Sequence, residues 1–185
     1  FTGKGLGYYN RAAHANCTAV NNEYYGATHG GAGGRIDTHT CGDYREPTFM
    51  GGGGYHSSRG GAAIHVITNE LFLNGTIDMS GGTNTFSGGA GGSIWIDANV
   101  IEGYGALLAN GANHASNNYY GAGGGGRIAV HANTFPFVET GVLQAMGGAG
   151  GSYTGNGSTN GPEIDLGFEP QWLLWKNTNG TDNWE

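Results

Sequence analysis

Acidic side chains are the first to weigh for catalysis, because glycoside hydrolysis needs two carboxyl groups roughly 5–10 Å apart. Asp97 ends the alternating segment that begins at Ile94, and Asp78 and Glu102 are the acids that could pair with it. The acids do not recur as a cluster, and both lysines lie near the ends of the chain, at positions 4 and 176. Acids in this pattern are typical of solvated strand faces and turns. We therefore predict no catalytic residue and a protein that is not an enzyme.

The seven histidines lack the spacing of a metal site. The sequence holds no His-x-His or His-x₃-His pair and no Gly-Gly-x-Gly-x-Asp calcium repeat. His39, His65 and His131 recur in alternating segments, which predicts positions on strand surfaces. The glycines before Arg127 lack the Lys-Ser/Thr ending of a phosphate-binding loop. Neither a metal nor another cofactor is predicted.

Aromatic residues on polar loops are the best candidates for ligand contact. The sequence Tyr-Tyr-Gly-Ala occurs twice after a polar loop, and each copy leads into Gly-Gly-Arg-Ile. Flat rings among Asn, Ser and His are typical of carbohydrate-contacting and adaptable binding loops. Packing of one tyrosine of each pair over the neighbouring glycines is the alternative. The candidate surface contacts are Tyr24, Tyr25, Trp95, Tyr119 and Tyr120.

Two cysteines, Cys17 and Cys41, flank a glycine-rich run. A disulfide between them would contribute a few kcal/mol in an oxidising compartment, and two buried thiols are the alternative. Four Asn-x-Ser/Thr sequences are candidate glycosylation sites if the chain passes through a eukaryotic secretory route. These are Asn16, Asn74, Asn156 and Asn179.

A repeated pattern organises residues 60–148. Each copy begins with two glycines and an alternating apolar segment, and a Gly-x-(Ile/Leu) segment follows. The first segments are anchored by Ile64, Ile94 and Ile128, and the second by Ile77, Leu107 and Leu143. A weaker copy precedes them, with Ile36 and Phe49 at the equivalent positions. Self-similarity with a period near thirty is typical of stacked repeat architectures.

The repeats predict an all-β fold. The anchor segments alternate apolar and polar residues, as half-buried strands do, and glycine is too frequent for a helix to propagate. A parallel β-helix would align Ile36, Ile64, Ile94 and Ile128 as one inward ladder. The glycine runs would then form corners, or they would pack side by side as polyglycine-II-like extended helices. Glycines with positive φ favour corners, whereas uniform extended angles favour the second arrangement, and both can coexist.

The chain divides at residue 152, where the glycine runs stop and tryptophans become frequent. Residues 1–151 are predicted to be a Gly-rich β-solenoid, with repeats near 33–59, 60–90, 91–124 and 125–151. Residues 152–185 are expected to be the truncated start of a separate β module.

The second module carries a specific set of short motifs. It has Tyr-x-Gly-Asn-Gly-Ser at 153–158, Gly-Phe-x-Pro at 167–170, an aromatic strand ending at Lys176 and Asn-Trp at 183–184. Residues 152–185 thereby resemble a module of bacteriophage tail-fibre and tail-associated proteins. Residues 33–151 are similar to the Gly-rich repeats of surface and adhesin proteins. The resemblance implies a virion fibre or surface adhesin that attaches to a host.

Charge and hydropathy exclude two classes of partner. The formal net charge is −7, with seven basic residues in 185, which argues against nucleic-acid binding. No apolar run is long enough to cross a membrane as a helix. We expect a non-enzymatic fibre or adhesin segment at a virion or extracellular surface. Its expected partners are a host-surface glycan or protein and further copies of itself in a trimer or filament. A glycosylated extracellular filament or cell-surface adhesin is the first alternative, and a β-helix polysaccharide lyase or glycosidase is the second.

Overall fold

The computed structural model describes residues 1–17, 19–20, 22, 24–35, 40–83, 86–114, 119–137 and 141–150, and the backbone of 163–165. Every element among these residues is a β strand. The strands are β1 (Ala63–Phe72), β2 (Thr76–Asp78), β3 (Ser93–Glu102), β4 (Ala106–Leu108), β5 (Arg127–Thr134), β6 (Val142–Gln144) and β7 (Glu163–Asp165). The prediction of an all-β chain is confirmed.

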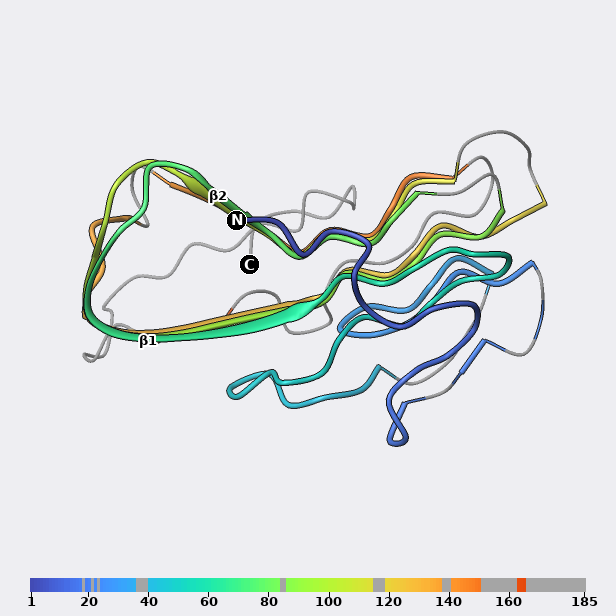
Figure 1. Ribbon diagram of the computed structural model, residues 1–185, viewed down its shortest axis with the longest axis horizontal. Helices are drawn as coiled ribbons and strands as arrows, with labels where there is room; N and C mark the ends of the chain where they lie inside the picture. The colour runs from blue at the N-terminus through green and yellow to red at the C-terminus, as the bar shows by residue number, and fades with distance from the viewer. Residues whose placement is uncertain are drawn as a thin grey trace, which may run out of the picture.

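The strands form two open, parallel sheets, with the order β1-β3-β5-β7 in one and β2-β4-β6 in the other. A long strand, a bend and a short strand make one layer, and Figure 1 shows successive layers following almost the same path. Ile64 pairs with Ile94 and Ile94 with Ile128, as the ladder prediction requires. Ile36, the fourth residue of that ladder, lies outside the described residues. The sheets are not closed on one another, so the solenoid remains a prediction.

The core lies between the two sheets, because the anchor residues of both point inward. Ile94, Ile96, Ile128 and Val130 from the long strands have no exposed surface, and neither does Leu107 from β4. Burying each such side chain contributes about 1.5–3 kcal/mol. The alternation seen in the sequence therefore places the apolar residues inside and leaves the intervening polar residues on the outer faces.

The glycine runs hydrogen-bond to several neighbouring segments, and their bonds repeat every three residues. Run 121–126 shows this most clearly. Gly121 and Gly124 donate to the carbonyls of Tyr24 and Ala27, and Gly123 and Gly126 donate to those of Ala112 and Ala109. The same run accepts bonds from Gly88 and Gly91, again three residues apart, at the carbonyls of Gly121 and Gly124. Backbone groups of one segment thus point in turn to different neighbours, whereas a strand has neighbours on two sides only.

Glycine is required in these runs because their backbones approach too closely for a side chain. A Cβ on Gly26 would lie 1.9 Å from the carbonyl oxygen of Ala122, and one on Gly126 would lie 2.0 Å from that of Gly92. Among the described glycines only Gly5, Gly42 and Gly103 have positive φ. Contact between segments, rather than left-handed turn geometry, therefore explains the glycines of the runs.

The N-terminal region adds a partial layer to the second sheet. Thr2 forms a parallel bridge with Asp78, and the amide of Gly3 donates to the carbonyl of Asp78. By contrast, the weaker copy of the repeat has no strand at Phe49 and Met50. The ring of Phe49 instead stacks on His14, with ring centroids 3.5 Å apart. The alternation around Phe49 is too short to specify a strand, and glycines 51–54 join the hydrogen-bonded runs.

Candidate functional site

A His–Asp–His cluster lies on the outer face of the first sheet. Alternation along β1, β3 and β5 turns His65, Asp97 and His131 away from the core. The carboxylate of Asp97 accepts hydrogen bonds from Nε2 of His65 at 2.6 Å and from Nδ1 of His131 at 2.8 Å. An ionised carboxylate only accepts hydrogen bonds, so the imidazole nitrogen in each contact carries a hydrogen. Each of the three side chains is about a third exposed, at 32%, 32% and 28% respectively.

Asp97 is held ionised by its neighbours. Partial burial would raise its pKa, but hydrogen bonds from His65, His131 and Trp95 outweigh burial, and the pKa lies below its ordinary value. The third bond runs from Nε1 of Trp95 to Oδ1 at 3.0 Å. Asp97 is therefore a fixed negative charge, which suits a role in structure or binding better than one as a general acid.

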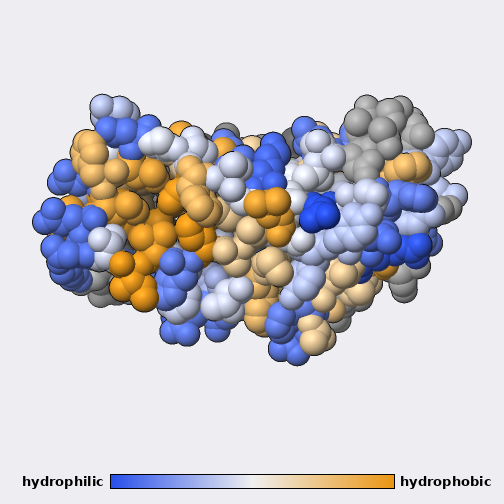
Figure 2. Space-filling model, in the orientation of Figure 1, coloured by the Kyte–Doolittle hydropathy of each residue, from blue (hydrophilic) through white to orange (hydrophobic). Residues whose placement is uncertain are grey.

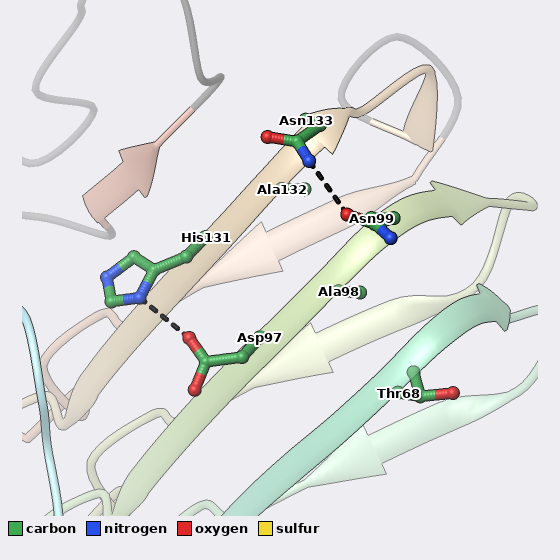
Figure 3. Close-up of a pocket in the computed structure, with 7 residues that line it drawn as sticks. All are labelled: Thr68, Asp97, Ala98, Asn99, His131, Ala132 and Asn133. Atoms are coloured by element: carbon green, nitrogen blue, oxygen red, sulfur yellow. Dashed lines mark hydrogen bonds and ion pairs between the residues drawn. The ribbon is translucent and has the colours of Figure 1, made fainter.

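A ladder of asparagines continues the same face. Nδ2 of Asn99 donates to Oδ1 of Asn69 at 2.6 Å, and Nδ2 of Asn133 donates to Oδ1 of Asn99 at 2.7 Å. Figure 3 shows Asn99 and Asn133 beside the Asp97–His131 pair, around an open hollow. The residues that line this hollow are Thr68, Asp97, Ala98, Asn99, His131, Ala132 and Asn133. The hollow offers amide, imidazole and carboxylate groups to a polar ligand.

The acids considered for glycoside hydrolysis are not brought together. Asp78 belongs to β2 in the other sheet, whereas Asp97 lies on β3. Glu102 is five residues further along β3, or about 16 Å at the rise of an extended strand. That separation exceeds the spacing that either class of glycosidase uses. The described residues therefore place no second carboxylate from this set beside Asp97.

Trp95 is less accessible than the sequence suggested. Its ring stacks on His65, with centroids 3.6 Å apart and planes 6° from parallel. His131 meets it edge-on at a centroid distance of 6.3 Å. One face and the indole N–H of Trp95 are thus occupied, and the residue serves mainly to fix the two histidines.

The two Tyr-Tyr loops meet in space. Tyr24 and Tyr120 stack with ring centroids 5.6 Å apart, and Phe86 and His114 also contact Tyr120. Tyr119 is 64% exposed and Tyr24 is 37% exposed. Tyr25 differs, because it packs on the small apolar cluster of Val20, Ala27 and Ala90. Each loop therefore has one packed and one more exposed tyrosine, Tyr25 and Tyr24 in the first loop, Tyr120 and Tyr119 in the second.

A buried polar cluster links the N-terminal region to the start of β5. Nδ1 of His29 donates to the carbonyl of Gly91 at 2.8 Å, and Nε of Arg127 donates to the carbonyl of Cys41 at 3.0 Å. Burial lowers the pKa of His29 to about 4, against the raising effect of the bond to Gly91. Burial likewise lowers the pKa of Arg127. Within the described chain, Nε2 of His29 and Nη1 of Arg127 have no hydrogen-bond partner.

The two cysteines form a disulfide in the structure, between Cys17 and Cys41. The disulfide restrains the loop that contains Cys41, and the backbone of Cys41 contacts both members of the buried cluster. Its amide donates to the carbonyl of His29, and its carbonyl accepts the bond from Arg127. Of the four candidate glycosylation sites, Asn16 and Asn74 are exposed. Asn156 and Asn179 lie outside the described residues.

Two kinds of feature are absent from the described residues. No group of three or more His, Cys, Asp or Glu side chains is placed to hold a metal ion there. The described residues also contain no helix that is long and apolar enough to cross a bilayer.

The asparagine ladder was not foreseen, although the sequence carries its signal. Asn69, Asn99 and Asn133 each stand five residues after the anchor isoleucine of their repeat. Aligning the repeats on those isoleucines brings the asparagines into one column, and parallel strands in register then stack them. The histidines form no such column in the aligned repeats. His65 directly follows its anchor isoleucine, whereas His131 is the third residue after its own.

Comparison with known families gives one match. Residues 145–185 match a family model described as a domain of unknown function, DUF7483. The matched segment begins directly after β6 and covers residues 152–185, which the sequence predicts to be a separate module. No curated protein and no solved structure matched the chain.

Proposed function

We propose that this chain is a non-enzymatic structural segment of a fibre or adhesin, in a viral (phage) tail fibre or appendage that attaches to a host surface. In this role the repeats supply a stiff shaft, and loops and outer faces of the shaft contact the host. The observation that carries the proposal is the stacking of equivalent strands from three successive repeats in unbroken register.

We further propose that the repeats continue as a parallel solenoid. Each layer contributes one long strand, one short strand and glycine segments. The glycine segments are assigned a polyglycine-II-like packing, since three residues per turn is the repeat of that extended helix. The three-residue spacing of hydrogen bonds in run 121–126 supports this assignment. So does the absence of positive φ at the described glycines of that run.

Two surfaces are assigned to host contact. The first is the aromatic cluster of the two loops, in which Tyr24 and Tyr119 are exposed. Exposed flat rings stack on sugar rings and on apolar side chains alike. The second is the hollow beside Asp97, where side-chain amides and imidazoles are offered to hydroxyl groups. A host-surface glycan or protein is the partner proposed for both.

Electron microscopy of the intact particle that carries this chain would test the proposal. We expect density for the repeats in an elongated fibre or appendage, bare asparagines at positions 16 and 74, and the Tyr24–Tyr120 cluster on the surface facing the host. Branched density on Asn16 or Asn74 would overturn the phage assignment and favour a glycosylated extracellular filament, because both side chains are exposed.

Cleavage of a polysaccharide by this chain would overturn the non-enzymatic part of the proposal. The purified chain should leave acidic and neutral polysaccharides uncleaved, as judged by reducing ends and by absorbance of unsaturated products. Cleavage that is lost in Asp97→Asn would establish the glycosidase or lyase alternative instead.

A further inference from the structure

The first sheet has an open edge at β1. Ile64 and Val66 occupy the same rows as Ile94, Ile96, Ile128 and Val130. The four residues on β3 and β5 have no exposed surface, but Ile64 and Val66 are only half-buried. The residue types and rows are the same, so the difference in exposure arises because no described strand lies on the outer side of β1. Figure 2 shows apolar surface over this part of the molecule.

The second sheet has its open edge at the opposite end of the stack, at β6. Ile77 on β2 is 6% exposed because residues 1–3 run beside it. Leu143 holds the equivalent position on β6 and is half-buried, and its neighbour Val142 is 44% exposed. No described residue pairs with the outer side of β6.

The two ends therefore carry complementary half-layers. At one end β7 extends the first sheet past β5, whereas no described residue pairs with the outer side of β6. At the other end residues 1–3 extend the second sheet past β2, whereas no described strand pairs with the outer side of β1. When one copy follows another along the stacking direction, β7 and the partner's residues 1–3 together make one complete layer.

We propose that copies of this chain associate head to tail through these ends, with β7 of one copy pairing in parallel with β1 of the next. The inference rests on the proposed fibre function and specifies how the fibre is assembled. Parallel strands keep one direction throughout the stack, so a simple continuation brings equivalent backbone groups together. Unpaired edge strands are templates for such pairing.

The register along the sheet assigns the contacts. Val130 pairs with Ile164 within the chain, and Val66 holds the same row, so Ile164 pairs with the partner's Val66. Glu163 takes the register position beside the partner's His65 by the same reasoning. In the second sheet the partner's Phe1, which is 77% exposed in the single chain, takes the position beside Leu143. The contacts at Val66, Leu143 and Phe1 bury apolar side chains that are exposed or half-buried in the isolated chain.

An interface between unlike ends does not close on itself, so assembly yields open rods. Sedimentation velocity of the full chain should show species that lengthen as protein concentration rises. Val66→Lys blocks one end and Leu143→Lys blocks the other, and each variant alone should remain monomeric. An equimolar mixture should form dimers and nothing larger, because it contains one intact pair of ends per dimer.

Ile67→Lys is the matched control. Ile67 neighbours Val66 on the same strand but is 75% exposed and points outward, so a lysine there should leave rod formation intact. Circular dichroism and thermal midpoints verify that each variant is folded. A wild-type chain that is monomeric at all concentrations, a closed trimer, or a mixture without dimers would overturn the inference. A monomer that still binds host cells would leave the proposed function standing.

Discussion

Tyr24 and Tyr120 are in stacking contact, with ring centroids 5.6 Å apart, although they belong to loops far apart in the sequence, each of which precedes a Gly-Gly-Arg-Ile segment. The contact turns two separate stretches of sequence into one aromatic surface. Arg35 strengthens it, because its guanidinium lies 5.5 Å from the centroid of the Tyr24 ring and donates to the carbonyl of Tyr119.

Tyr119→Ala should lower binding to host cells or to a glycan array at least tenfold, with an unchanged thermal midpoint. The expectation follows from the 64% exposure of Tyr119, which presents much of this residue at the surface of the aromatic cluster. Tyr25→Ala is the comparison, because Tyr25 packs on Ala27 and Ala90 and should lose stability instead. Equal loss of binding in both variants at matched stability would contradict this division of roles.

Gly126→Ala should destabilise the fold by at least about 2 kcal/mol, because the new methyl group overlaps backbone that cannot move aside. The obstacle is the carbonyl oxygen of Gly92, 2.0 Å from the added carbon. Gly75→Ala is the matched control, since nothing lies within 4 Å of its added carbon. That change should be neutral or stabilising by up to about 1 kcal/mol. Urea titrations of the two variants provide the measurement, and similar midpoints would refute the close-packing argument.

Acid should destabilise the fold through His29. Its pKa is about 4 in the folded chain and 6.5 in the reference state, so the unfolded chain binds the extra proton between these values. Stability therefore decreases as pH falls from about 6.5 towards 4, by an amount on the order of 3 kcal/mol. His29→Asn keeps a donor for the carbonyl of Gly91 and removes the titration. Its unfolding free energy should be lower at pH 7 but flatter across that window, and an unchanged slope would rule out His29 as the source.

Removing the disulfide should cost about 3 kcal/mol, the value expected for closing a loop of this length. The double variant Cys17→Ser/Cys41→Ser should also expose Arg127. The disulfide holds in place the segment around residue 41, whose backbone carbonyl accepts a hydrogen bond from Nε of Arg127. Guanidinium unfolding with and without reductant measures the first effect, and hydrogen exchange at residues 127–130 measures the second. Wild-type protein whose midpoint is insensitive to reductant would show that the bridge adds no stability.

The features that depend on short-range periodicity could be predicted from the sequence. Ile64, Ile94 and Ile128 could be aligned because alternation and repeat spacing both marked them, and their register follows directly. The Asp97 cluster could not be foreseen, since it depends on which row each histidine reaches across neighbouring strands. The same limit applies to the meeting of Tyr24 with Tyr120. Glycine runs carry no side-chain pattern, so their partners are fixed only by tertiary packing.

The three-residue hydrogen-bond period of run 121–126 also constrains how such a protein can change length. In the proposed polyglycine-II-like packing, adding or deleting three residues would advance the run by one full turn and return each donor to its former direction. A change of one or two residues would rotate all following N–H donors by about a third or two thirds of a turn. The donors would then point away from the carbonyl groups that now accept their hydrogen bonds. Length variation within the runs should therefore occur in steps of three, whereas the connecting loops can vary freely.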